Sequence, residues 1–144
     1  MRAKVLTEGE ERTFVLIFDQ GETVIAPLMA FAKKHRLTGS RLSGIGALSQ
    51  VTLGYFDLTQ KTYLEIPLHE QVEVLSLVGN LALHNRDHKV HAHIVVGKRD
   101  GTAHGGHLLE ATVNPTLEIM LIESPSYLQR QFDPAIGLAL LTVE

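Results

Sequence analysis

Residues 89–108 have the sequence KVHAHIVVGKRDGTAHGGHL, and this stretch decides both the fold and the candidate site. His91 and His93 are separated by one residue, so on a β-strand their side chains point to the same face. The alternate apolar residues from Val90 to Val96 fill the opposite face. The stretch therefore predicts a strand with one side in the core and the other side carrying imidazoles.

The turn that follows, Lys98-Arg-Asp-Gly-Thr102, determines which later histidine joins this pair. A two-residue Asp-Gly loop would place His93 opposite Leu108 and would send His107 to the other face. A three-residue loop with its glycine in the left-handed conformation pairs Lys98 with Thr102, and therefore pairs His93 with His107. In this second register all three imidazoles share a face.

Three histidines on one face can form a metal site. Directly opposite residues of an antiparallel pair have Cβ atoms roughly 4.5–5.5 Å apart, which lets His91, His93 and His107 converge on one divalent ion. Three neutral nitrogens and an open fourth position suit zinc best, although the ligand set alone leaves iron, nickel and cobalt open. Gly105 and Gly106 allow close backbone approach and are assigned to a ligand pocket beside the site. The alternative is a solvated pair, His91 and His93, with an unrelated hydrogen-bonding His107.

The rest of the chain predicts an α+β fold with a mixed, mostly antiparallel sheet and one main helix. An apolar run at Thr13–Phe18 predicts a strand, and helical spacing predicts a helix from Glu22 to Arg36, whose start shifts later if Pro27 lies in its first turn. A second short helix is an option near Ser126–Gln131. Further strands are expected at Arg41–Ile45, Val51–Phe56, Tyr63–Ile66, Val72–Val78, Lys89–Val96, His107–Val113, Leu117–Ile122 and Ile136–Val143.

Composition narrows the class of protein. The 144 residues suit one domain spanning 1–144, with 44% hydrophobic and 20% charged residues. The formal charge of -3, with no basic run longer than Lys33–Arg36, argues against autonomous nucleic-acid binding. The absence of cysteine excludes disulfides, thiolate catalysis and cysteine-ligated zinc. No signal-like or membrane-length apolar segment occurs, so we expect a cytoplasmic protein without a membrane partner.

One carboxylate is a further candidate for the site. Glu118 falls within an apolar strand, where a charged group needs a partner. It could accept a hydrogen bond from a ligand imidazole, or serve as a fourth metal ligand. A salt bridge at a subunit interface explains it equally well.

The histidine run resembles the signature of a known family. His91-Ala-His93, Asp100-Gly101 and Gly105-Gly106-His107-Leu108 are similar to the plant and prokaryote conserved (PPC) domain. The resemblance implies an α+β fold, a homotrimer and a metal unit at His91, His93 and His107. No Arg-Gly-Arg-Pro core is present, so the chain resembles a stand-alone prokaryotic-type member without an AT-hook. Further blocks match in the same order: Gly21-Glu22, Ser43–Ala47, Gly54–Asp57, Glu73–Asn80 and Pro115–Ile119.

Two classes of function follow. The leading hypothesis is a non-enzymatic, trimeric, metal-binding oligomerisation or interaction module that holds a structural metal or recruits a small anionic ligand at the metal, with any DNA association through a partner. The competing hypothesis is a metal-dependent lyase or related enzyme acting on a small oxo or hydroxy acid, because the implied fold is similar to that of acetolactate decarboxylase. An open coordination position favours the second, since structural zinc sites are normally closed.

Overall fold

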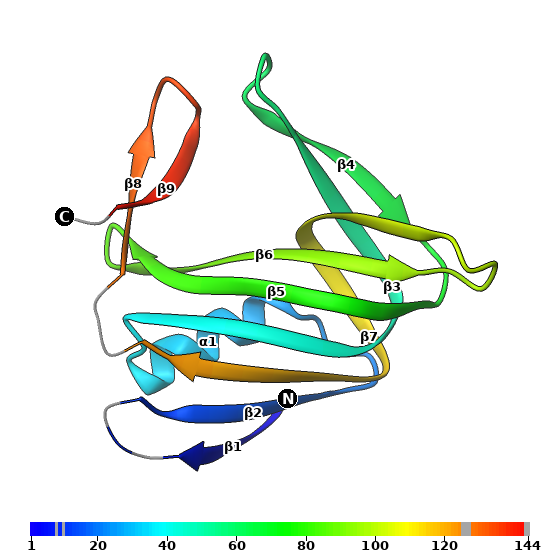
Figure 1. Ribbon diagram of the computed structural model, residues 1–144, viewed down its shortest axis with the longest axis horizontal. Helices are drawn as coiled ribbons and strands as arrows, with labels where there is room; N and C mark the ends of the chain where they lie inside the picture. The colour runs from blue at the N-terminus through cyan, green and yellow to red at the C-terminus, as the bar shows by residue number, and fades with distance from the viewer. Residues whose placement is uncertain (8, 10, 125–127, 143–144) are drawn as a thin grey trace.

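A computed structural model describes residues 1–7, 9, 11–124 and 128–142. This part of the chain forms a mixed, mostly antiparallel sheet with one helix, as expected (Figure 1). The elements in chain order are β1 (Arg2–Thr7), β2 (Thr13–Asp19), α1 (Ile25–His35), β3 (Gly39–Asp57), β4 (Thr62–Leu68), β5 (Val72–His84), β6 (Asp87–Gly97), β7 (Ala103–Glu123), β8 (Gln129–Asp133) and β9 (Leu138–Thr142).

The sheet bends because β3 and β7 are long and change neighbours along their length. The main strand order is β1-β2-β7-β3-β5-β8-β9, while β4 pairs with β3, and β6 pairs with both β5 and β7. The ladders β3–β5, β5–β6, β6–β7 and β7–β3 therefore form a ring. The β5–β8 ladder alone among those described is parallel. This ring brings the start of β7 beside β6, where the histidines lie.

Two expected strands, His107–Val113 and Leu117–Ile122, are parts of the single strand β7. Pro115 lies between these two expected strands, and proline cannot donate a ladder hydrogen bond. In the structure the β3–β7 register shifts at this point, between the pairs Leu48↔Val113 and Gly46↔Leu117. Pro115 therefore lies in a bulge, where its missing N–H group is not needed.

Helix α1 begins at Ile25, so Pro27 lies in its first turn and the start is later than Glu22. The first turn is held from outside the helix, because the Glu110 carboxylate accepts a hydrogen bond from the Val24 N–H at 3.2 Å. The helix lies behind the sheet (Figure 1), contacts β6 and β7, and buries Leu28, Phe31 and Ala32. Burial of each large side chain contributes roughly 1.5–3 kcal/mol, which anchors the helix to the sheet.

The expectation of a second short helix near Ser126–Gln131 is wrong for residues 128–131, which the structure describes. Residues 126–127 lie outside the described residues, and Gln129–Gln131 belong to strand β8. Strand β8 pairs with β9 from Gln129 to Asp133, and this pairing overrides the weak helical pattern. No helix within the described residues is long and apolar enough to cross a membrane.

Candidate metal centre

The β6–β7 turn has the three-residue geometry that the sequence predicts. The Lys98 N–H donates to the Thr102 carbonyl at 2.8 Å, and the Gly101 N–H donates to the Lys98 carbonyl at 3.0 Å. Gly101 has φ 83°, a left-handed conformation that glycine adopts without steric cost. The resulting register pairs His93 directly with His107. The turn therefore places the third histidine on the face of the first two.

The three imidazoles are close enough to share an ion. The Nε2 atoms of His91 and His93 lie 3.3 Å apart. Two nitrogens bound to one tetrahedral zinc at about 2.0–2.1 Å would lie about 3.3 Å apart, so this pair fits zinc. One ligand atom from each of His91, His93 and His107 lies within 4.8 Å of the others. The donor set could therefore hold a metal ion.

The electrostatic environment keeps two of these rings neutral. Burial, followed by the neighbouring charges of His91, His93 and Arg130, lowers the pKa of His107 to about 4. Burial, then Arg130 and His93, also lowers the pKa of His91. A histidine must be deprotonated to bind a metal. Both rings are consequently prepared for coordination at neutral pH.

Tyr63 on β4 contacts the third histidine, which sequence reasoning missed. Its hydroxyl lies 3.4 Å from His107 Nδ1, and the two ring centroids are 4.6 Å apart. If Nδ1–H donates to the tyrosine oxygen, Nε2 is the nitrogen left for the metal. Burial raises the pKa of Tyr63, which therefore stays a neutral phenol. The sequence placed Tyr63 on a strand but gave no sign of which residue it would meet.

The other predicted site residues lie elsewhere. Glu118 is exposed and pairs with Ile45, on a part of β7 separated from β6 by strands β3 and β5. Three strand spacings make this about 14 Å, so Glu118 does not reach the triad within one chain. Gly105 and Gly106 pair with Val95 and Ile94 on β6. A Cβ on Gly106 would lie 2.9 Å from the Gly54 carbonyl oxygen, so this glycine permits close packing of β7 on β3 and does not line the cavity described next.

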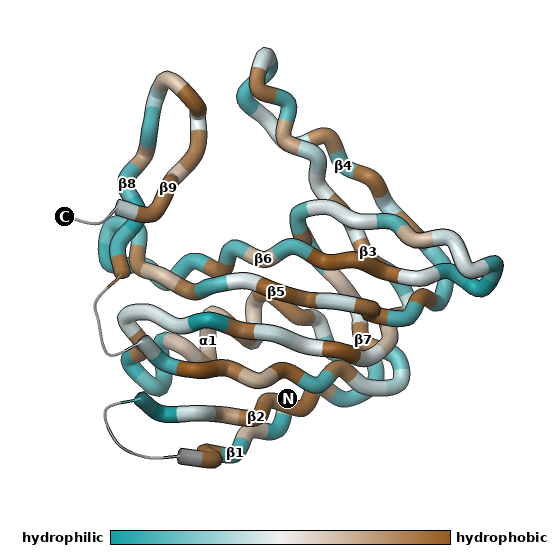
Figure 2. Tube along the Cα trace, in the orientation of Figure 1, coloured by the Kyte–Doolittle hydropathy of each residue, from teal (hydrophilic) through white to brown (hydrophobic). Residues whose placement is uncertain are grey.

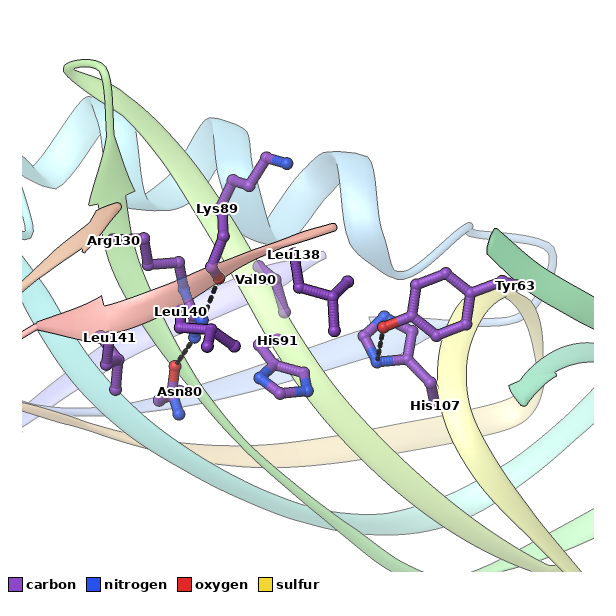
Figure 3. Close-up of a pocket in the computed structure, with 11 residues that line it drawn as sticks. Tyr63, Asn80, Lys89, Val90, His91, His107, Arg130, Leu138, Leu140 and Leu141 are labelled. Atoms are coloured by element: carbon purple, nitrogen blue, oxygen red, sulfur yellow. Dashed lines mark hydrogen bonds between the residues drawn. The ribbon is translucent and has the colours of Figure 1, made fainter. Parts of the chain in front are cut away.

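A cavity of about 300 Å³ opens beside two of the histidines (Figure 3). His91 and His107 form part of its lining, together with Tyr63. Arg130 from β8 and Asn80 from β5 also line it, and sequence reasoning missed both. Its apolar wall comes from β9 and β6, through Leu138, Ala139, Leu140, Leu141 and Val90. The candidate metal centre thus borders a small pocket with one apolar side.

Comparison with known proteins places the chain in a family. A family model of the Plants and Prokaryotes Conserved (PCC) domain matches residues 6–125. A plant- and prokaryote-conserved protein from Pyrococcus horikoshii is 35% identical, with a TM-score of 0.85 and 91% of each chain covered. A metal-containing protein from Archaeoglobus fulgidus is 30% identical, with a TM-score of 0.84 over 98% of this chain and 96% of that one. A candidate DNA-binding protein from Bacteroides thetaiotaomicron is 28% identical, with a TM-score of 0.87 over 97% and 96%.

Two further comparisons set the limits of this similarity. The acetolactate decarboxylase of Bacillus subtilis strain 168 has a TM-score of 0.57 at 13% identity over 88% of this chain and 58% of that one, which shows a shared fold alone. The bifunctional protein GlmU of a Synechococcus strain is 36% identical over 99% of this chain, and the chain spans about a fifth (22%) of its length. The family model covers residues 6–125, well over half of the chain, which leads to one conclusion: the chain belongs to the Plants and Prokaryotes Conserved (PCC) domain family.

Proposed function

We propose that the protein is a trimeric, metal-binding interaction module whose centre is formed by His91, His93 and His107. The observation that carries this proposal is the His93↔His107 pairing, which brings three imidazoles within 4.8 Å of one another. Zinc suits this all-nitrogen set best, and when bound it would supply a Lewis acid with a coordination position that these histidines leave open. The metal-containing relative supports the same assignment.

Metal content tests the centre directly. Purified protein loaded with zinc and then desalted should carry one zinc per chain by elemental analysis. His107→Ala and His91→Ala should lose most of it, because two imidazoles bind zinc much more weakly than three. His104→Ala is the matched control, since His104 pairs with the buried Val96 and therefore faces away from the triad. Equal metal content in all four proteins would refute the centre.

An exposed apolar face of the sheet supports the trimer. Ile45, Leu75 and Val78 are 60%, 55% and 53% exposed, and Val95 and Met120 are also exposed. The strand pairings place these residues on one face of β3, β5, β6 and β7, opposite the face that carries the buried Leu77, Ile94 and Ile119. Figure 2 shows hydrophobic stretches along these strands. A contiguous apolar surface of this kind marks a protein interface. We propose that other copies of this chain cover it, as the family resemblance implies.

The oligomer is tested by changing this face. Light scattering after gel filtration should give the mass of three chains for the wild type. Leu75→Arg should give the mass of one chain, because it places a charge in the centre of the proposed interface. Leu58→Arg is the control, since Leu58 is 70% exposed but lies in the turn after β3, beyond this face. A monomeric wild type, or an unchanged mass for Leu75→Arg, would contradict the trimer.

A second candidate is a metal-dependent lyase or related enzyme for a small oxo or hydroxy acid. The cavity of about 300 Å³ beside His91 and His107 favours it, because a purely structural ion needs no adjoining pocket. A bound zinc would polarise a carbonyl group at such a site. Incubation of zinc-loaded protein with 2-oxo and 2-hydroxy acids, followed by NMR, should then show product that His107→Ala does not form. If none of these acids is converted, the enzyme hypothesis is rejected and the interaction module remains the proposed function.

We propose that any association of this protein with DNA takes place through a partner protein. The chain carries a formal charge of -3, and phosphate binding requires clustered cations. The protein alone should therefore give no gel shift with duplex DNA at low salt. A shift that weakens steeply as salt rises would instead show direct binding.

A further inference from the structure

Two hairpins enclose the cavity beside the histidines. The turn between β3 and β4 meets the turn between β8 and β9, where the Lys61 ammonium donates a hydrogen bond to the Pro134 carbonyl at 2.7 Å. The β8–β9 hairpin joins the main sheet through two residue pairs, Leu83↔Gln129 and His84↔Arg130. Tyr63 and Arg130 thus reach the same cavity from opposite hairpins (Figure 3).

Arg130 is a buried cation with unused hydrogen-bonding capacity. Its side chain belongs to a residue only 5% exposed. One terminal nitrogen, Nη1, donates to the Ala139 carbonyl at 3.0 Å, and Nη2 donates to the Asn80 side-chain oxygen. Its Nε–H is buried and has no hydrogen-bond partner among the described residues. A guanidinium has five N–H groups, so the described contacts leave donors free.

The positive charge of Arg130 also has no partner of opposite sign among the residues with described positions. The ion pairs found there join Glu22, Asp19, Glu123 and Glu70 to other cations. A buried charge without a counter-ion is unfavourable, and Arg is suited to bind a carboxylate through two parallel hydrogen bonds. The cavity is therefore complementary to an anion.

The size and the apolar wall of the cavity define the rest of the ligand. A volume of about 300 Å³ is at the lower end of small-molecule sites. Leu138, Leu140 and Leu141 from β9 and Val90 from β6 line one side. A small acid with a short apolar chain would satisfy both features, whereas a sugar phosphate or an inorganic ion would leave the leucines in contact with polar groups.

We propose that Arg130 binds the carboxylate of a small organic acid with a short aliphatic chain, in the cavity that adjoins the histidine triad. This ligand class deepens the proposed function, because the acid would be the small anion recruited at the metal. The proposed contact between Arg130 and the carboxylate does not require the metal ion. Carboxylate binding by metal-free protein therefore distinguishes the two proposals.

The probes are 3-methylbutanoate and its uncharged analogue 3-methylbutanamide, titrated by calorimetry into zinc-loaded and metal-free protein. The two probes have nearly the same shape, so their affinity ratio reports the charge interaction alone. A charged hydrogen bond in a buried site should favour the carboxylate by about tenfold or more. This preference should hold in metal-free protein. Equal affinities, or no binding of either probe to either form, would overturn the assignment to Arg130.

Two variants separate ligand binding from a structural role of Arg130. Arg130→Gln should remove the preference for the carboxylate, whereas Arg41→Gln, at an exposed position, should keep it. Leu140→Glu keeps Arg130 and places a competing carboxylate on the cavity wall, at a residue that is 37% exposed and tolerates charge. This variant should lower the affinity for 3-methylbutanoate by at least about tenfold. The proposal is refuted if either Arg130→Gln or Leu140→Glu keeps the wild-type preference for the carboxylate. Having two variants keeps the test decisive if one of them folds poorly.

The two proposals fail in different ways. If the metal centre is wrong, zinc does not bind, yet the metal-free protein still prefers the carboxylate and loses this preference with Arg130→Gln. If the carboxylate site is wrong, zinc still binds stoichiometrically, and neither probe distinguishes Arg130→Gln from the wild type.

Discussion

Replacing His107 with glutamine should flatten the pH dependence of the free energy of unfolding of the metal-free protein between pH 7.5 and pH 5. Burial and the neighbouring charges lower the pKa of His107 to about 4 in the folded state, while an unfolded chain has a histidine pKa of about 6.5. As the pH falls through 6.5, the unfolded state binds a proton that the folded state refuses. The wild type therefore loses stability as the pH decreases, and the loss is complete below about pH 4.

The size of this effect follows from the two pKa values. Linkage between about 6.5 and 4 gives a loss of about 2 kcal/mol from pH 7.5 to pH 5 for a fully protected ring. His107 is only partly buried, so solvent screening reduces this to about 1 kcal/mol. His91 shifts in the same direction and adds to the wild-type loss. His107→Gln should remove the His107 contribution and keep the remainder.

Urea unfolding followed by far-ultraviolet circular dichroism, in the presence of a chelator, measures both slopes. The range above pH 5 avoids the carboxylates with lowered pKa values, such as Asp19 and Glu123, which lose their stabilising effect at lower pH. Leu58→Gln, at an exposed turn position, is the control and should keep the wild-type slope. Equal slopes for the wild type and His107→Gln would refute the buried, mutually repelling arrangement of the triad.

Four other substitutions test the residues that position the three histidines. Tyr63→Phe should weaken zinc binding about 10-fold or more in a chelator competition, because the imidazole loses its hydrogen-bond partner; an unchanged affinity would exclude this role. Gly79→Ala should lower the free energy of unfolding by about 1–3 kcal/mol, because its Cβ would lie 2.4 Å from the His91 carbonyl oxygen. Gly105→Ala, whose nearest contact would be 3.3 Å, should cost less, and equal losses would contradict the steric argument. Gly101→Ala should cost about 1 kcal/mol in the same urea experiment, because its φ of 83° strains any side chain, and a neutral result would contradict this turn geometry.

The histidine hairpin could be predicted from sequence because its determinants are local. Alternation fixes the face of His91 and His93, and the loop length fixes their register with His107. The structure has this loop and this register. The start of α1 after Val24 could also be predicted from the sequence, since Pro27 restricts where a helix can begin.

The surroundings of the triad depend on contacts between segments that are far apart in the chain. Tyr63 reaches His107 from a hairpin 44 residues earlier in sequence, and Arg130 reaches Asn80 across 50 residues. Local periodicity carries no information about such contacts. The same limitation explains Glu118, whose apolar strand suggested burial, although the structure places it on an exposed face of the sheet.

The most direct measurement is an X-ray absorption spectrum of the zinc-loaded protein, with zinc content determined on the same sample. The account predicts one zinc per chain, with three imidazole nitrogens at about 2.0–2.1 Å and one oxygen ligand from water or an added acid. His107→Ala should lose the three-imidazole signal. A spectrum with only oxygen neighbours, or a metal content that does not depend on His91, His93 and His107, would contradict the central claim.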